Sequence, residues 1–526
     1  MPESLDAAEA APLAGGFVLT DYTSNGNPTP ASDISIMHLA RGKLSCVRIN
    51  MTTIDSWAWL RWVAVVMFPC GTALSAAEGV LSSCRVPYVE EAARCGEVKV
   101  PENPAIPDGR QLAISVAVLP ASSGKALPDP IVVLMGGPGE EAIAAAADFA
   151  RMFASLRNDR DILLVDQRGT GRSATLACKL YSDEDPATSL GDLFPVAAVE
   201  RCREQLSARA DLTQYSFVRV AHDLEHIRRT LGYGRMNLSA GSSGTRAAQV
   251  YMRAYPQSVR TVLLHSIVPI DIPMPLLMAK TAEAAMESTL KACASESACN
   301  AAFPNIGNEL RQIMARLDSG TVFVALSGGS ESQLHRGRVG EWFRSQLYRP
   351  ATAATLPWLI HQAYMGNWSP IVEGVLTNAR DLDTALSIGV FFSITCSEDI
   401  VFVREQDVSP QTQGTFLGDY RLRQQQVACK QWPKASVPRN YRSPVRSSVP
   451  TLFVSGDSDG GTPLWMTDHA AKGFSNRAEV VMRNQGHTEW NECVAKLYEQ
   501  FVRSGTARGI DTESCPAPPL PPFRTQ

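Results

Sequence analysis

Short apolar runs alternate with helical periodicity from residue 112 onward. The runs are bounded by Gly, Pro or Asp, which is typical of strands buried on both faces. They predict strands over 114–119, 131–135, 162–165, 236–239, 262–267, 452–455 and 480–482. Apolar residues at offsets of three and four predict helices over 221–231 and 245–255. Strand and helix in alternation indicate an α/β fold with a mostly parallel sheet.

The alternation stops between residues 269 and 449. Helical patterns fill this stretch, over 276–294, 308–317, 339–347 and 355–364, and a link rich in Gln, Arg and Pro follows over 421–450. We expect a helical cap over 269–449, inserted before the last strands. The core would then comprise 78–268 and 450–515, followed by a Pro-rich tail over 516–526.

The chain before residue 78 has a different composition. Residues 1–50 form a polar extension without clear periodicity, and 51–77 combine Arg61, an apolar run and the small residues 75–77. That order is typical of a secretory signal peptide, although a buried apolar segment would read the same way. Signals begin close to the first Met, so translation from Met37 or Met51 is a further possibility.

Composition and charge exclude several classes of protein. The 526 residues are 45% hydrophobic and 19% charged, enough to bury a large core, so the chain is not disordered overall. Its 49 Lys and Arg against 53 Asp and Glu give a net charge of -4, which disfavours nucleic-acid partners. No apolar stretch reaches the roughly 18 to 20 residues of a stable membrane span.

The cysteines agree with export to the periplasm or the medium. Of 12 cysteines, Cys46 and Cys70 lie at or before the end of the expected signal's apolar run. The other ten form five pairs of sequence neighbours: Cys84 and Cys95, Cys178 and Cys202, Cys293 and Cys299, Cys396 and Cys429, Cys493 and Cys515. Pairing between neighbours would close five short loops, as suits a periplasmic or secreted protein, whereas ten free thiols would suit a cytosolic one. The sequence leaves the connectivity open.

A nucleophile motif lies between the strand at 236–239 and the helix at 245–255. It reads Ala240-Gly-Ser242-Ser-Gly244, in which small residues stand two before and two after the central serine. A sharp strand-to-helix turn needs small residues at both places because the backbones pass closely. Ser242 is therefore the expected nucleophile, and Ser243 is the alternative.

A glycine-rich turn, 136–139, follows the strand at 131–135. Backbone N–H groups of such a turn can stabilise an oxyanion, and we name Gly137 and Ser243 as the donors, since Pro138 has no N–H. The alternatives are an ordinary strand-to-helix loop or a phosphate-binding nest.

The acid and the base follow later strands. Asp459 comes after the strand at 452–455, and His487 comes after the strand at 480–482. Carboxyl ends of parallel strands meet at one edge of a sheet, so both can reach Ser242. Asp457 is the rival acid because it lies closer to its strand.

Five segments together resemble the α/β-hydrolase peptidases of the proline iminopeptidase and tripeptidyl aminopeptidase family: 136–139, 166–173, 239–246, 456–463 and 486–487. The resemblance covers about 84–515 and implies an α/β-hydrolase fold, a Ser242–His487–Asp459 triad and a cap over the site. Two departures stand out. Ser243 replaces the family's usual aromatic residue, and Glu140 and Glu141 replace small residues.

The function predicted is a serine hydrolase of the aminopeptidase type acting on peptides, without metal or organic cofactor. A carboxylesterase acting on small esters is the alternative, because the same groups cleave both bonds. An aminopeptidase needs a carboxylate to hold the substrate's ammonium group, and the candidates are Glu398, Asp399, Glu140 and Glu141. The oligomeric state is not predicted.

Two other classes of protein fit the sequence less well. His222 to His226 matches the HxxEH signature of zinc peptidases, but the same helix supplies core positions. A hydrolase-like binding protein is disfavoured because all three triad residues are present.

Overall fold

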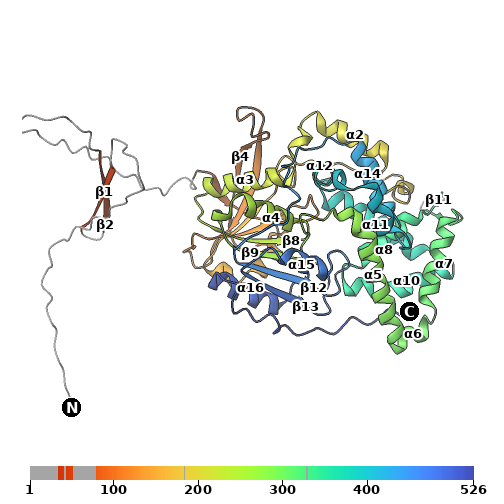
Figure 1. Ribbon diagram of the computed structural model, residues 1–526. Helices are drawn as coiled ribbons and strands as arrows, with labels where there is room; N and C mark the ends of the chain where they lie inside the picture. Colours follow the sequence, from red (N-terminus) through yellow and green to blue (C-terminus); the bar gives the residue numbers. More distant parts are fainter. Residues whose placement is uncertain (1–32, 41–42, 51–78, 183, 327–329) are drawn as a thin grey trace, which may run out of the picture. The chain divides into compact units, whose positions relative to one another are not determined.

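The computed structural model describes residues 33–40, 43–50, 79–182, 184–326 and 330–526, in two units, Met1–Ser75 and Ala76–Gln526. In the first unit, strand β1 (Asp33–Ala40) pairs antiparallel with β2 (Lys43–Asn50) (Figure 1). The sequence pattern had not predicted this hairpin. The whole expected signal peptide, residues 51–77, lies outside the described residues.

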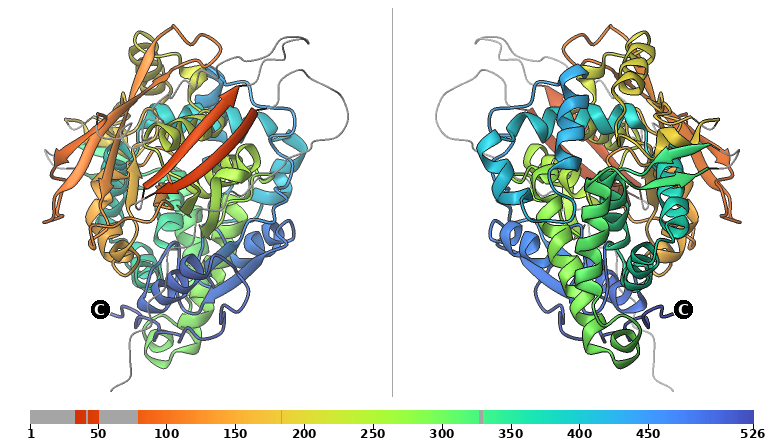
Figure 2. Two further views of the ribbon diagram at one scale, coloured as in Figure 1. Left: turned by 90° about the vertical axis from the view of Figure 1, so that its left-hand side faces the viewer. Right: turned by 90° about the vertical axis from the view of Figure 1, so that its right-hand side faces the viewer.

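A nine-stranded sheet forms the centre of the second unit, in the order β13-β12-β9-β8-β6-β7-β5-β4-β3. Its strands are β3 (Leu81–Cys84), β4 (Ala93–Pro101), β5 (Gln111–Leu119), β6 (Ile131–Leu134), β7 (Ile162–Val165), β8 (Met236–Gly241), β9 (Val259–His265), β12 (Thr451–Gly456) and β13 (Arg477–Met482). From β7 to β13 all neighbours are parallel, while β3, β4 and β5 run antiparallel. The seven predicted strands are all present. β12 and β13 lie at one edge with the other C-terminal elements, drawn in blue (Figure 2).

Successive side chains of a strand point to opposite faces of the sheet, and on each face they pack into an apolar cluster. Both faces of this sheet are therefore buried. On β6, Val132 and Leu134 join the apolar cluster that contains helices α3 (Phe217–Thr230) and α4 (Gly244–Ala254). Ile131 and Val133 join the opposite cluster, which contains α16 (Glu492–Ser504) and α1 (Ala146–Met152). The sheet therefore lies between two helical layers, and the predicted α/β fold with a mostly parallel sheet is confirmed.

The stretch expected to be a cap is mostly helical and has its own apolar core. Its helices are α5 (Met274–Ser295), α6 (Ser297–Ala302), α7 (Ile306–Asp318), α8 (Arg336–Gln346), α9 (Pro350–Ala353), α10 (Leu356–Tyr364), α11 (Ser369–Ala385), α12 (Ile388–Glu398), α13 (Val408–Thr412) and α14 (Tyr420–Gln431), with a hairpin of β10 (Phe323–Ala325) and β11 (Glu331–Gln333). The prediction of a link from residue 421 was wrong for its first part. α14 is a helix because Leu422, Gln425 and Cys429 are buried at helical spacing among polar residues.

Within the described residues, no single helix is long and apolar enough to cross a membrane. In the part of the chain that the structure describes, α11 and the segment from Ile388 to Phe402 are long and apolar enough only as a pair, and they are bent against each other by 87°.

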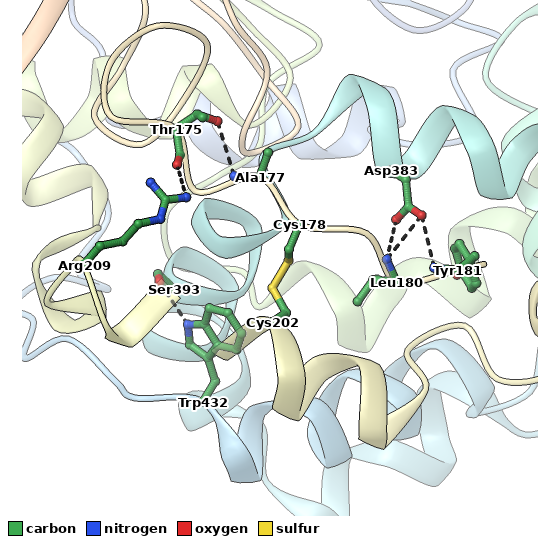
Figure 3. The surroundings of a disulfide bond; sticks show 10 residues. All are labelled: Thr175, Ala177, Cys178, Leu180, Tyr181, Cys202, Arg209, Asp383, Ser393 and Trp432. Atoms are coloured by element: carbon green, nitrogen blue, oxygen red, sulfur yellow. Dashed lines mark hydrogen bonds between the residues drawn. A yellow bond between two sulfur atoms is a disulfide. The ribbon is translucent and has the colours of Figure 1, made fainter. Parts of the chain in front are cut away.

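Five disulfides within the described residues join neighbouring cysteines: Cys84–Cys95, Cys178–Cys202, Cys293–Cys299, Cys396–Cys429 and Cys493–Cys515. Cys178–Cys202 ties the loop after β7 to helix α2 (Val196–Ser207) (Figure 3). In the same loop, the N–H groups of Leu180 and Tyr181 donate to Asp383 of α11. The stretch expected to be a cap is thus fastened to the loop after β7.

The Pro-rich tail packs against the cap. The Arg524 N–H donates to the Ala354 carbonyl, and its guanidinium lies 3.5 Å from the centre of the Trp358 ring. Composition alone could not predict this contact.

Candidate active site

Ser242 lies on a sharp turn between β8, which ends at Gly241, and α4, which begins at Gly244. Its φ of 52° is in the left-handed region, which a serine seldom occupies. The turn needs Gly244, since a Cβ there would lie 2.2 Å from the Leu134 carbonyl oxygen. The sequence therefore holds Ser242 in the strained conformation of a nucleophile elbow.

Ser243, the alternative nucleophile, has ordinary helical backbone angles at the N-cap of α4. Its Oγ is buried and has no hydrogen-bond partner among the described residues. Both serines border one cavity of about 620 Å³, which His487 and Gly137 also line.

Asp459 and His487 lie three and five residues beyond β12 and β13 and come together as predicted. His487 Nδ1 is 2.8 Å from Asp459 Oδ2. The other carboxylate oxygen accepts the N–H groups of Gly461 and Thr462, each at 2.8 Å, and the Thr462 hydroxyl donates to Oδ2. Burial alone would raise the pKa of Asp459, but His487 and these hydrogen bonds outweigh it and hold that pKa below its ordinary value. The carboxylate stays ionised and orients the imidazole.

The loop that carries His487 is held from both sides. The His487 N–H donates to the Tyr348 carbonyl at 2.7 Å, and the two rings stack with centres 4.9 Å apart. On the other side, the Thr488 N–H donates to Ser266 Oγ at 2.9 Å. Because Tyr348 comes from the expected cap, that stretch helps to position the histidine. No motif or spacing in the sequence indicates this role of Tyr348.

Asp457, the rival acid, points elsewhere. Its Oδ1 accepts the N–H of Asn484 at 2.7 Å, and Arg483 lies 3.8 Å from its other oxygen. These contacts hold the turn after β13, and Asp457 does not border the cavity.

The glycine-rich turn lies beside the elbow, as expected for an oxyanion site. A Cβ placed on Gly136 would lie 3.1 Å from the Ser242 Cβ. Gly137 has a φ of 100°, which only glycine adopts readily, and it borders the cavity. The N–H groups of Gly137 and Ser243 thus belong to the two segments that flank Ser242.

Two family models match the chain. The one described as "alpha/beta hydrolase fold" matches residues 129–292, and the one described as "TAP-like protein" matches 414–515. Together with the sheet order and the elbow, these matches identify the architecture. The chain has the α/β-hydrolase fold.

Relatives of this α/β-hydrolase-fold protein include named peptidases. It is 29% identical over 273 residues to "Serine protease Hip1" of Mycobacterium tuberculosis, covering 46% of this chain and 52% of that protein. It is 26% identical over 191 residues to "Tripeptidyl aminopeptidase" of Streptomyces lividans, covering 33% and 35%. The chain thus spans about half or less of the length of these relatives. The matches confirm the resemblance to α/β-hydrolase serine peptidases.

Glu398, a predicted substrate-binding acid, does not border the cavity of this hydrolase fold. It is fully buried, and its carboxylate accepts the N–H of Phe217 at 2.8 Å and the hydroxyl of Tyr441. Burial raises the pKa of Glu398 to about 7. The expectation that Glu398 faces the substrate is corrected: its carboxylate joins the start of α3 to the segment after α14.

Asp399 borders the cavity but already has a partner. Its Oδ1 lies 2.7 Å from Arg246 Nη1 and accepts the Met274 N–H at 3.1 Å. Glu141 is exposed and faces Asp166 and Arg172 outside the cavity. Of the four predicted acids, Glu140 alone borders the cavity without an ion-pair partner among the described residues.

The Asp399–Arg246 pair predicts a stability effect. Both side chains are almost fully buried, so Asp399→Asn leaves the Arg246 guanidinium without a counter-ion. Breaking a buried pair from one side costs about 3–5 kcal/mol of unfolding free energy. Urea denaturation of Asp399→Asn should show a loss of that size, and the exposed Asp381→Asn should show little. A variant of unchanged stability with a raised KM for free-amine substrates would instead make Asp399 the ammonium anchor.

The HxxEH segment is occupied by structural contacts. Glu225 is buried and accepts hydrogen bonds from Arg228, Arg229 and the Tyr251 hydroxyl, while His222 and His226 are exposed on α3. Within the described ranges, no group of three or more His, Cys, Asp or Glu side chains is arranged to hold a metal ion.

Proposed function

We propose that the protein is an exported serine hydrolase of the aminopeptidase type. The observation that carries the proposal is the strained Ser242 turn, which borders the same cavity as a His487 already hydrogen-bonded to a buried Asp459. Relatives named as a serine protease and a tripeptidyl aminopeptidase support the peptidase type.

The proposed reaction is acyl transfer. His487 Nε2 takes the proton of Ser242 Oγ as that oxygen attacks the substrate carbonyl carbon, and Asp459 stabilises the imidazolium. The N–H groups of Gly137 and Ser243 hold the oxyanion, each worth about 3–4 kcal/mol of barrier. His487 then returns the proton to the leaving amine, and water, activated by the same histidine, hydrolyses the acyl-enzyme.

A carboxylesterase is the second candidate, because the triad and oxyanion site serve esters equally well. The test is a panel of aminoacyl, dipeptidyl and tripeptidyl amides beside short-chain esters. The proposal predicts turnover of free-amine amides that a serine-directed phosphonate stops and a chelator leaves intact. Turnover of esters alone would establish the esterase. Loss of activity to the chelator but not to the phosphonate would establish a metal-dependent reaction.

Five disulfides among the described residues support export, because such bonds persist in oxidising compartments. Export can be tested separately from the reaction. We predict that the exported protein begins near residues 76–78 and that ten cysteines resist alkylation until reduced. Mass spectrometry before and after reduction measures both. Ten freely alkylated cysteines on a chain that still carries Met1 would contradict export.

A further inference from the structure

Among the four candidate acids, Glu140 borders the cavity and has no ion-pair partner among the described residues. It follows the glycine-rich turn after β6 and lines the same cavity as the predicted oxyanion donors, Gly137 and Ser243. The charged and polar groups that act on it are the Gly136 backbone and His487, and no Arg or Lys among the described residues pairs with it. Burying a carboxylate without an opposite charge is costly, and a substrate ammonium group would supply that charge.

The distance between this carboxylate and the nucleophile is short. A Cβ built on Gly136 would lie 3.1 Å from the Ser242 Cβ and 3.4 Å from the Glu140 Oε2. The Ser242 Cβ and the Glu140 Oε2 are therefore no farther apart than the sum of these two distances. A substrate group that touches Glu140 must lie close to the carbonyl that Ser242 attacks.

That closeness discriminates between substrates. In an N-terminal residue released singly, the ammonium nitrogen is two bonds from the scissile carbonyl carbon. In an extended tripeptide the ammonium lies two residues farther away, about 7 Å more. Glu140 matches the ammonium of a single residue, whereas a tripeptide's ammonium would reach past it toward the cap, where Asp381 of α11 borders the same cavity.

The charge of Glu140 also opposes substrates that lack a cation. A carboxylate beside the oxyanion site disfavours the negative charge that develops on the carbonyl oxygen. A substrate ammonium cancels that effect, but an N-blocked amide or ester leaves it in place. The same side chain would thus favour free amines and act against blocked substrates.

We propose that Glu140 binds the α-ammonium group of the substrate beside the scissile carbonyl, so that the protein releases single N-terminal residues. This inference rests on the proposed serine hydrolase function. It concerns specificity alone and leaves the triad chemistry unchanged.

The test compares Glu140→Gln with Glu141→Gln, its neighbour outside the cavity. For a free aminoacyl amide, Glu140→Gln should lower kcat/KM at least tenfold, about 1.4 kcal/mol per decade. For the N-acetyl ester of the same amino acid, kcat/KM should stay equal or rise. Glu141→Gln should leave both substrates nearly unchanged. Equal losses on both substrates, or no loss on either, would overturn the anchor role.

The pH dependence gives a second readout. Burial raises the pKa of Glu140, while the Gly136 backbone and His487 oppose the shift. The anchor acts only when ionised, so the preference of the wild-type protein for free amines over N-acetyl substrates should fall as pH drops through that raised pKa. Glu140→Gln should abolish this change in preference; a preference that falls identically in Glu140→Gln would overturn the inference.

The failure of this inference is distinct from that of the proposed function. If Ser242→Ala is inactive but Glu140→Gln is unaffected, the serine mechanism stands and the anchor is wrong. If wild-type protein prefers tripeptidyl to aminoacyl amides and Asp381→Asn removes that preference, the anchor is Asp381. If Ser242→Ala keeps full activity, the proposed function itself is wrong.

Discussion

Ser242→Ala should lower kcat by about a millionfold, as loss of the nucleophile does in another Ser-His-Asp triad. The fold should survive, because alanine keeps the backbone bonds of the turn, including the N–H that donates to His265. Rates on a free aminoacyl amide, with circular dichroism as the check on folding, measure the effect.

Ser243→Ala is the matched control. It retains the proposed oxyanion N–H and removes only a hydroxyl that has no partner among the described residues. It should keep most of the wild-type rate. The reverse result, an active Ser242→Ala and an inactive Ser243→Ala, would show that Ser243 is the nucleophile.

Asp459→Asn should lower kcat by about ten-thousandfold. An asparagine that presents its NH₂ to His487 Nδ1 favours the tautomer with the proton on Nε2, which cannot accept the serine proton. It also loses the charge that stabilises the imidazolium. Steady-state rates at neutral pH measure the loss.

Asp457→Asn is the control for that substitution, since Asp457 also follows β12 but contacts Asn484 and Arg483 instead of the histidine. Its activity should remain within a few-fold of wild type. A large loss in Asp457→Asn with a mild one in Asp459→Asn would reverse the assignment of the acid.

The sequence predicted the parts of the site that depend on local rules. The sharp turn at Ser242 could be predicted because a strand-to-helix turn needs small residues such as Ala240 and Gly244 around it. The contact between Asp459 and His487 could be predicted because parallel strands bring their carboxyl ends together, and β12 and β13 are parallel neighbours.

The sequence could not reveal which acids already have partners. Glu398 is a candidate cavity acid by sequence. In the structure, its carboxylate oxygens accept hydrogen bonds from Tyr441, 43 residues away, and from Phe217, 181 residues away. Tyr348 was missed for the same reason, because its carbonyl meets His487 only after the helices of the cap pack on the core. Such partners depend on tertiary packing, which periodicity and spacing in the sequence do not reveal.

β4 shows a further limit of periodicity. Its exposed face carries charged residues such as Glu97 and Lys99, so the strand lacks the apolar run that marked the parallel strands. An antiparallel strand exposed on one side needs only alternate apolar residues.

The most direct test of the central claim is to label the active protein with a fluorophosphonate and to locate the adduct by tandem mass spectrometry. We predict a single adduct on Ser242, with loss of activity in proportion to labelling, and no adduct in Ser242→Ala. An adduct on Ser243 or elsewhere, or full activity in protein labelled to completion on Ser242, would contradict the account.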